Sequence, residues 1–211
     1  FMPVATAVID PVLAIAAFAL SALSSLFTLV PAAWSQCDKR LTLAMTLAAT
    51  VTLPAGVWLL GWLDPDTVQL SVAAVAGVSL LALMAGLRFS LRPGLGPSVA
   101  TAGAAGVMGG AMGLLGPIVI LFNLAPGDKA AQVRANTLVF QTLGSLLVIP
   151  QMALQGLLRP SALWLGAFLF PAYAAGNLLG VRLFSPEREV LYRRVAYGII
   201  ALAIAVGLGR M

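Results

Sequence analysis

Long apolar stretches separated by short polar interruptions dominate this sequence. They run at about 11–33, 41–63, 68–88, 134–157, 162–184 and 191–211, close to the roughly 20 residues that a helix needs to cross a hydrocarbon core. They are far longer than the roughly 10-residue alternating strands of an outer-membrane barrel. Because lipid cannot satisfy backbone polar groups, each stretch predicts an α-helix. The pattern therefore predicts an all-α, polytopic integral membrane helical bundle.

The interruptions carry signals that stop one helix and start the next. In Asp64-Pro65-Asp66 the proline suits the first turn of the following helix. The other interruptions combine charge with Pro or Gly, which break helices. They are Trp34 to Arg40, Arg92-Pro93-Gly94, Pro126-Gly127-Asp128-Lys129, Arg159-Pro160-Ser161 and Ser185-Pro186-Glu187.

Composition strengthens the membrane prediction and excludes several functions. The chain is 61% hydrophobic and only 9% charged, whereas soluble domains carry roughly 25% charged residues. The net charge of +5 is typical of a membrane protein that gathers Lys and Arg in cytoplasmic loops, so we expect no nucleic-acid partner. With no histidine and the single Cys37, a His- or Cys-based zinc site, a haem histidine and a His-dependent triad are excluded. We expect no metal, cofactor or enzymatic activity.

The two halves of the chain match each other at a nearly fixed offset of about 120 residues. Glycines, prolines and leucines recur in the same order, and their order along the whole chain favours a duplication over coincidence. Examples are Leu23 with Leu143, Gly56 with Gly176, Pro65 with Pro186 and Gly77 with Gly198, while Pro3 and Pro11 fall on Pro117 and Pro126. We expect a first repeat at 1–98 and a second at 99–211, together forming one transmembrane domain.

Residues 99–115 of the second repeat have no counterpart in the first. The sequence also starts with Phe1, inside an apolar run. We therefore expect roughly 20 to 30 further residues to precede it if the duplication is complete.

A glycine-rich segment, VATAGAAGVMGGAMGLLGP at residues 99–117, opens the second repeat. Gly106 and Gly110 form a GxxxG pattern, which is typical of close helix packing in membranes. Packing does not explain Gly116-Pro117, which should interrupt the helix and leave the first amides of a new one without partners.

The distribution of Lys and Arg predicts how this segment runs. If residues 99–124 crossed the membrane once, the twelve Lys and Arg residues would divide equally between the two sides. If the segment returns to its side of origin, all of these Lys and Arg residues except Arg159 and Arg210 lie on one side of the membrane, as the positive-inside rule expects. We therefore favour a re-entrant hairpin, which makes the repeats inverted, an architecture of secondary transporters. A single crossing with parallel repeats is the alternative.

Broken helices that meet at half depth in the membrane can bind anions through their N-terminal amides. Polar uncharged side chains nearby would add donors, although their structural role would be interhelical hydrogen bonding. Asp10 and Arg134 lie at helix starts and are weaker candidates than the polar uncharged residues, which also include Ser21, Ser24, Thr137 and Thr142. The substrate-binding candidates are Pro3, Thr6, Ser25, Gly109, Gly110, Gly113, Gly116, Pro117, Ile118, Asn136, Gln141 and Ser145.

The run GVMGGAMGLLGPIVILFNL, followed by VRANTLVFQ and later by SPEREVLYRRV, resembles the second repeat of the sulfite exporter TauE/SafE family of membrane permeases. The similarity extends over the whole chain, with MPVATAVIDP where the first repeat has its proline-containing half-helix. Two features depart from the family pattern. The first glycine-rich motif is absent, and Gly113-Leu114-Leu115-Gly116 stands where many members are richer in glycine.

The resemblance implies a multi-pass permease of the inner membrane. Its substrate would be a small anion, such as sulfite, a sulfonate or another sulfur-containing or organic anion, moved by alternating access. An anion channel is the main alternative, although no ring of like charges or selectivity signature appears. Two less favoured alternatives are a non-transporting membrane assembly subunit and an enzyme that uses the Asp10 carboxylate. The sequence leaves the oligomeric state open, a homo-oligomer included.

Overall fold

A computed structural model describes residues 2–85, 94–122, 130–183 and 189–208. Within these ranges the chain is helical and contains no strand, so the all-helical prediction is confirmed. The predicted interruptions around Pro93, Pro126 and Pro186 lie outside the described residues. The helices are α1 (Met2–Ala5), α2 (Pro11–Ala22), α3 (Ser25–Thr28), α4 (Val30–Trp34), α5 (Lys39–Trp62), α6 (Pro65–Met84), α7 (Leu95–Met112), α8 (Gly116–Phe122), α9 (Ala130–Leu154), α10 (Pro160–Leu183) and α11 (Glu189–Leu208).

Several of these helices are long and apolar enough to cross a membrane. Five such stretches occur among the described residues, at Pro11–Thr28, Lys39–Trp62, Pro65–Ala82, Ala131–Leu154 and Pro160–Arg182. They agree with the predicted spans to within a few residues, except that helix α9 extends a few residues further toward the N-terminus. Helix α11, predicted as a further span, is formed but is not among the five.

Side-chain caps and glycines define the helix ends. The Asp10 carboxylate accepts the Leu13 amide at 3.1 Å before α2, and the Asp38 carboxylate accepts the Leu41 amide at 3.0 Å before α5. Such caps satisfy amides that lack intrahelical partners. Helix α9 ends at Leu154. Gly156 follows with a φ of 71°, which suits glycine, and the Leu157 amide donates back to the Met152 carbonyl in a Schellman pattern.

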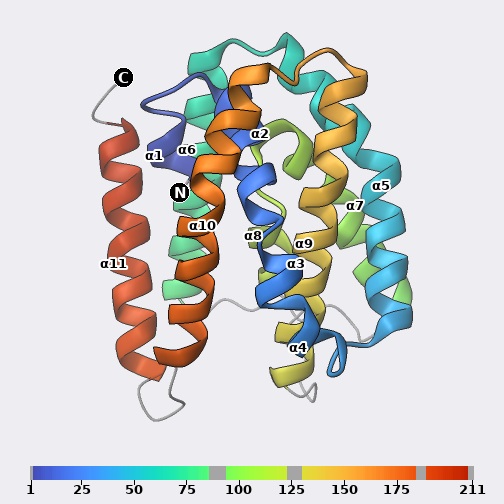
Figure 1. The fold of residues 1–211 in the computed structure, drawn as a ribbon. Helices are drawn as coiled ribbons and strands as arrows, with labels where there is room; N and C mark the ends of the chain where they lie inside the picture. The colour runs from blue at the N-terminus through green and yellow to red at the C-terminus, as the bar shows by residue number, and fades with distance from the viewer. Residues whose placement is uncertain (1, 86–93, 123–129, 184–188, 209–211) are drawn as a thin grey trace.

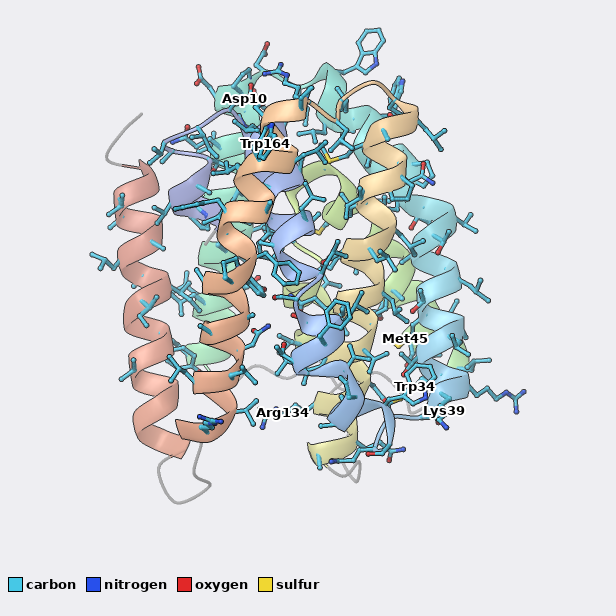
Figure 2. The ribbon with its side chains drawn as sticks, viewed as in Figure 1. Asp10, Trp34, Lys39, Met45, Arg134 and Trp164 are labelled. Carbon is cyan, nitrogen blue, oxygen red and sulfur yellow. The ribbon has the colours of Figure 1, made fainter. Side chains whose placement is uncertain are left out.

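The long helices lie side by side in a bundle with two distinct ends (Figure 1). At one end lie Asp10 and Trp164, and at the other lie Trp34, Lys39 and Arg134 (Figure 2). We call these the Asp10 end and the Arg134 end. Helices α2, α6 and α10 run toward the Arg134 end, whereas α5, α9 and α11 run away from it.

The glycine-rich helix α7 packs closely along α5 in the same direction. A methyl group at Gly106 would lie 2.8 Å from the Ala49 carbonyl, and one at Gly110 would lie 2.6 Å from the Leu53 carbonyl. The Thr52 hydroxyl also donates to the Gly103 carbonyl at 2.7 Å. The glycines therefore serve close helix packing, as the GxxxG pattern predicts.

Helix α9 also runs parallel to α5, because Asn136 bonds near the start of α5 and Gln155 donates to Pro54 further along. Because α7 and α9 both run parallel to α5, the chain must return toward the Arg134 end between them. The chain turns at Gly113 to Leu115, and α8 begins the return toward the Arg134 end (Figure 1). The glycine-rich segment is therefore broken and reverses.

Helix α2 is paired with α10 as α9 is paired with α5. Leu20 lies against Gly166, and the Asn177 amide donates to Ser25 at 3.0 Å, so α2 and α10 run in parallel. The surroundings of the two corresponding glycines, Gly56 and Gly176, differ. A methyl group at Gly56 of α5 would overlap the Val107 carbonyl of α7, whereas one at Gly176 of α10 has no atom of the described part of the chain within 4 Å.

The predicted first span at 11–33 is a single helix only as far as Ala22. Turns at Leu23 and Ser24 and at Leu29 separate the short helices α3 and α4. Pro31 occupies the first turn of α4, where its missing amide does no harm. Serine and threonine hydroxyls compete for backbone carbonyls here, since Ser21 donates to Phe18 and Thr28 to Ser24. The span is therefore kinked where a straight helix was expected.

Candidate functional site

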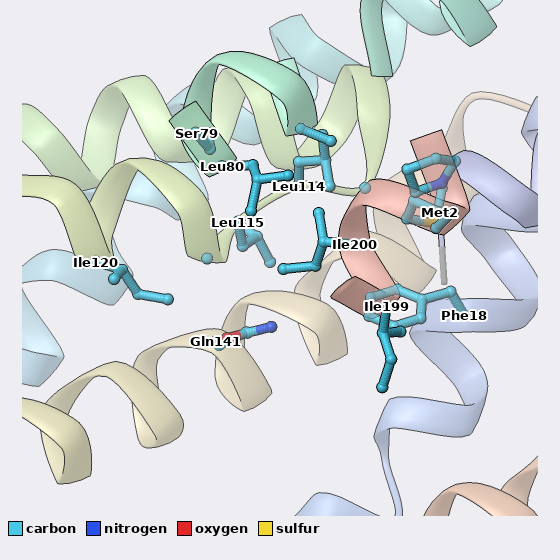
Figure 3. Close-up of a pocket in the computed structure, with 15 residues that line it drawn as sticks. Met2, Phe18, Ser79, Leu80, Leu114, Leu115, Ile120, Gln141, Ile199 and Ile200 are labelled. Carbon is cyan, nitrogen blue, oxygen red and sulfur yellow. The ribbon is translucent and has the colours of Figure 1, made fainter. Parts of the chain in front are cut away.

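A cavity of about 350 Å³ lies in the middle of the bundle, where α1, α2, α6, α9 and α11 meet the turn between α7 and α8 (Figure 3). We call it the central cavity. Of the described residues on its wall, only Ser79 and Gln141 have polar side chains. The lining residues are Met2, Pro3, Phe18, Ala76, Ser79, Leu80, Gly113, Leu114, Leu115, Gly116, Ile120, Gln141, Ile199, Ile200 and Ala203.

The turn between α7 and α8 forms one wall of the central cavity. Gly113 ends α7 with a φ of 70°, a left-handed conformation that glycine adopts without steric cost. The following Leu115 side chain folds back against Gly109 and Gly144. The sequence signal at Gly116-Pro117 thus marks a real break, and the break faces the cavity.

Gln141 is the polar side chain that meets this turn. It comes from the middle of α9 and is half-buried. A methyl group at Gly116 would lie 3.1 Å from its Oε1 atom, so a side chain at position 116 would crowd the Gln141 amide beside the break. The structure therefore brings together Gly113, Gly116 and Gln141, three of the predicted site residues, with Pro3 on the same cavity wall.

A smaller cavity of about 140 Å³ adjoins the central cavity on the other side of Gln141. We call it the neck. Its wall is more polar, because hydroxyl and amide groups come from α2–α3, α9 and α10. The lining residues are Phe18, Ala22, Ser25, Leu29, Leu138, Gln141, Thr142, Ser145, Tyr173 and Asn177. The predicted residues Ser25 and Ser145 belong here.

A third cavity, of about 510 Å³, lies nearer the Arg134 end and is called the vestibule. It shares Leu29, Leu138 and Asn177 with the neck. Arg134 lies on its wall and is exposed. Among the described residues that line the three cavities, Arg134 alone carries a charge.

The remaining predicted site residues lie elsewhere. Gly109 and Gly110 face Leu115 and helix α5, respectively. Ile118 packs against a core cluster that includes Met45 and Phe140. Thr6 is buried, and its hydroxyl donates to the Met2 carbonyl at 3.0 Å. The Pro117 side chain lies outside the described residues. Ser24 is wholly buried, and its hydroxyl has no hydrogen-bond partner within the described part of the chain.

Asn136 is placed against α5 rather than at a cavity described above. Its Oδ1 atom accepts the Asp38 amide at 2.7 Å and the Thr42 hydroxyl at 3.4 Å. These bonds join the start of α5 to α9 across 98 positions of sequence. The Asn136 side chain thereby adds an interhelical hydrogen bond at the N-terminus of α5, where backbone N–H groups lack intrahelical partners.

We expect Asn136→Ala to lower the free energy of unfolding by about 0.5–1.5 kcal/mol, because it removes the hydrogen bonds that join the start of α5 to α9. Thermal unfolding in detergent measures this loss, and Asn136→Asp, which keeps an acceptor oxygen, is the control. An unchanged stability together with a raised KM for transport would instead favour a ligand role for Asn136.

Several cavity residues could not be found from the sequence, Phe18 and Ser79 among them. Both sit within largely apolar helices, and neither belongs to a motif or carries a charge. Only the way α2 and α6 pack around the α7–α8 turn brings them to the cavity.

Comparison with known proteins now adds to this geometry. The family model described as Sulfite exporter TauE/SafE matches residues 1–208. No curated protein and no solved structure matches the chain. The match covers nearly the whole chain, and the apolar helices fit the membrane permeases of that family. The chain belongs to the sulfite exporter TauE/SafE family.

Proposed function

We propose that this protein is a permease that moves a small anion across the inner membrane, with the central cavity as its substrate site. The observation that carries the proposal is the meeting of the broken glycine-rich segment and Gln141 on one cavity wall. Family membership supports transport as the general function. Sulfite, a sulfonate or another sulfur-containing or organic anion is the proposed substrate.

In this proposal Gln141 and Ser79 donate hydrogen bonds to the anion. Both side chains lie on the cavity wall, and their amide and hydroxyl groups can donate. A bond from a neutral donor to a charged group is stronger than one between neutral groups. Gly113 and Gly116 let the backbone of the turn approach the same space, because neither carries a side chain that would fill it.

The mechanism we propose is alternating access between two halves of opposite orientation. Its support is the matched pairing of α2 with α10 and α9 with α5, in which corresponding helices run in opposite directions. The central cavity lies between the halves, so a rocking motion of one half against the other would expose it to each side in turn.

We further propose that the Arg134 end faces the cytoplasm. Lys39, Arg40 and Arg134 lie there, and Arg182 lies in the last turn of α10, which runs toward that end. Within the described residues, Arg159 belongs to the Asp10 end. Cytoplasmic loops of membrane proteins carry such an excess of Lys and Arg.

Reconstitution in proteoliposomes tests the function directly. We expect uptake of radiolabelled sulfite or a small sulfonate to saturate, and to speed up when the same unlabelled anion is loaded on the opposite side. This counterflow is a property of a carrier whose site faces one side at a time. Flux that grows linearly with concentration, without counterflow, would contradict the permease and favour the anion channel.

A further inference from the structure

The three cavities form a series from the Arg134 end to the centre of the bundle. The vestibule and the neck share wall residues, and the neck and the central cavity share two, Phe18 and Gln141. We propose that these two side chains form a gate through which the substrate passes between the neck and the central cavity. This inference rests on the proposed function and extends it to a route and a selective barrier.

The position of Phe18 carries the inference. The ring belongs to α2, and Gln141 belongs to α9, which packs against α2. No other described residue lines both the central cavity and the neck. Phe18 is partly buried and lines a cavity on each side of this border. A large apolar ring at such a border excludes water and hydrated ions while it stays in place.

Tyr173 of α10 holds the ring in that position. The two ring centroids lie 5.9 Å apart with the planes at 71°, an edge-to-face arrangement that is favourable for aromatic pairs. Tyr173 itself lines the neck. The contact links α2 to α10 at the level of the gate, so a displacement of α10 relative to α2 would release the ring.

The neck supplies polar partners for an anion that approaches the gate. Its wall presents the hydroxyls of Ser25 and Ser145 together with the amide of Gln141. The Ser25 oxygen accepts from the Asn177 amide at 3.0 Å, which leaves its own O–H group able to donate. Donors arranged in this way can replace the water that an anion loses on entering a narrow passage.

The charge at the outer end of the route fits an anionic substrate. Arg134 lies on the vestibule wall, and Lys39 and Arg40 lie at the same end of the bundle. Positive charge around a low-dielectric opening raises the local concentration of anions. An anion would therefore meet cationic groups, then the neutral donors of the neck, and then the Phe18–Gln141 gate.

Thiol labelling tests the gate without measuring transport. In a Cys37→Ser background, Ser79→Cys reports access to the central cavity and Ala32→Cys reports access to the vestibule. The protein is placed in sealed vesicles with the Arg134 end outward, and a membrane-impermeant thiol reagent is added outside. We expect Phe18→Ala to speed labelling at position 79 by about tenfold, equivalent to a barrier lower by about 1.4 kcal/mol. Labelling at position 32 should stay unchanged.

Phe168→Ala, which removes the same kind of ring from an exposed position of α10 that lines none of the three cavities, is the matched control and should leave both labelling rates as they were. An unchanged rate at position 79 in Phe18→Ala would overturn the gate. So would an equal rise at positions 32 and 79, because that would mean general loosening of the fold. If Phe18→Ala does not fold, Phe18→Leu replaces it, with the same outcomes. Absence of anion flux in the wild-type protein would refute the proposed function instead, and it would leave these labelling rates unaffected.

Discussion

Gly56→Ala is expected to destabilise the protein by about 1–3 kcal/mol or more, the usual cost of overpacking a close interface. The added methyl group would overlap the Val107 carbonyl and lie 3.0 Å from the Ala111 amide nitrogen. Since both are backbone atoms, α5 and α7 would have to move apart. The midpoint of thermal unfolding in detergent measures the effect, and Gly110→Ala, which meets Leu53 and Val57 across the same interface, should behave alike.

The sequence offers a matched control for this prediction at the corresponding position of the other repeat. Gly176 falls on Gly56 in the predicted duplication, yet no atom of the described residues lies within 4 Å of a methyl group placed there. Gly176→Ala should therefore leave the free energy of unfolding within about 0.5 kcal/mol of the wild-type value, as for other substitutions away from packed sites. Equal losses at the two positions would contradict the described packing of α7 on α5.

Gln141→Ala is expected to lower kcat/KM for anion transport by at least about tenfold. A hydrogen bond to a charged group contributes about 1.5–3 kcal/mol, and Gln141 is one of the two described side chains that can donate one into the central cavity. The double variant Gly116→Leu, Gln141→Ala should abolish measurable flux, because the leucine would also fill the space beside the break. Initial uptake rates in proteoliposomes, normalised to the amount of reconstituted protein, measure both effects.

Gln151→Ala is the control for the transport prediction. It changes the same residue type on the same helix, and Gln151 lines none of the three cavities. Its flux should match that of the wild-type protein. Retained flux in the double variant would show that the substrate does not use this wall, and the assignment of these site residues would then be abandoned.

The main features of the fold follow from local signals in the sequence. Asp10 and Asp38 cap helices, Pro65 starts one, and the Gly116-Pro117 pair marks the break between α7 and α8. Each signal acts through the backbone of its own turn, so a single sequence suffices to read it. The family resemblance, which rests on the same motifs, is confirmed over residues 1–208.

Features that depend on packing between distant segments could not be predicted in this way. Asn136 and Gln141 looked alike as polar residues in an apolar helix, yet one bonds to Asp38 of α5 and the other reaches the central cavity. Thr137 is a further polar residue of α9, and its hydroxyl donates to the Val133 carbonyl of its own helix. Phe18 carried no signal at all. Which face of α9 meets which neighbour is decided by tertiary packing.

The proposed function depends above all on the inverted orientation of the two repeats. In that arrangement the glycine-rich segment returns to its side of origin. Single cysteines at Gly96, Ala131 and Ser161 in a Cys37→Ser background test it, since all three positions are exposed. Intact cells and inverted membranes are labelled with a membrane-impermeant thiol reagent. We expect positions 96 and 131 to label from the same side and position 161 from the other. Labelling of positions 96 and 131 from opposite sides would mean that the segment crosses once, and it would contradict the inverted repeat.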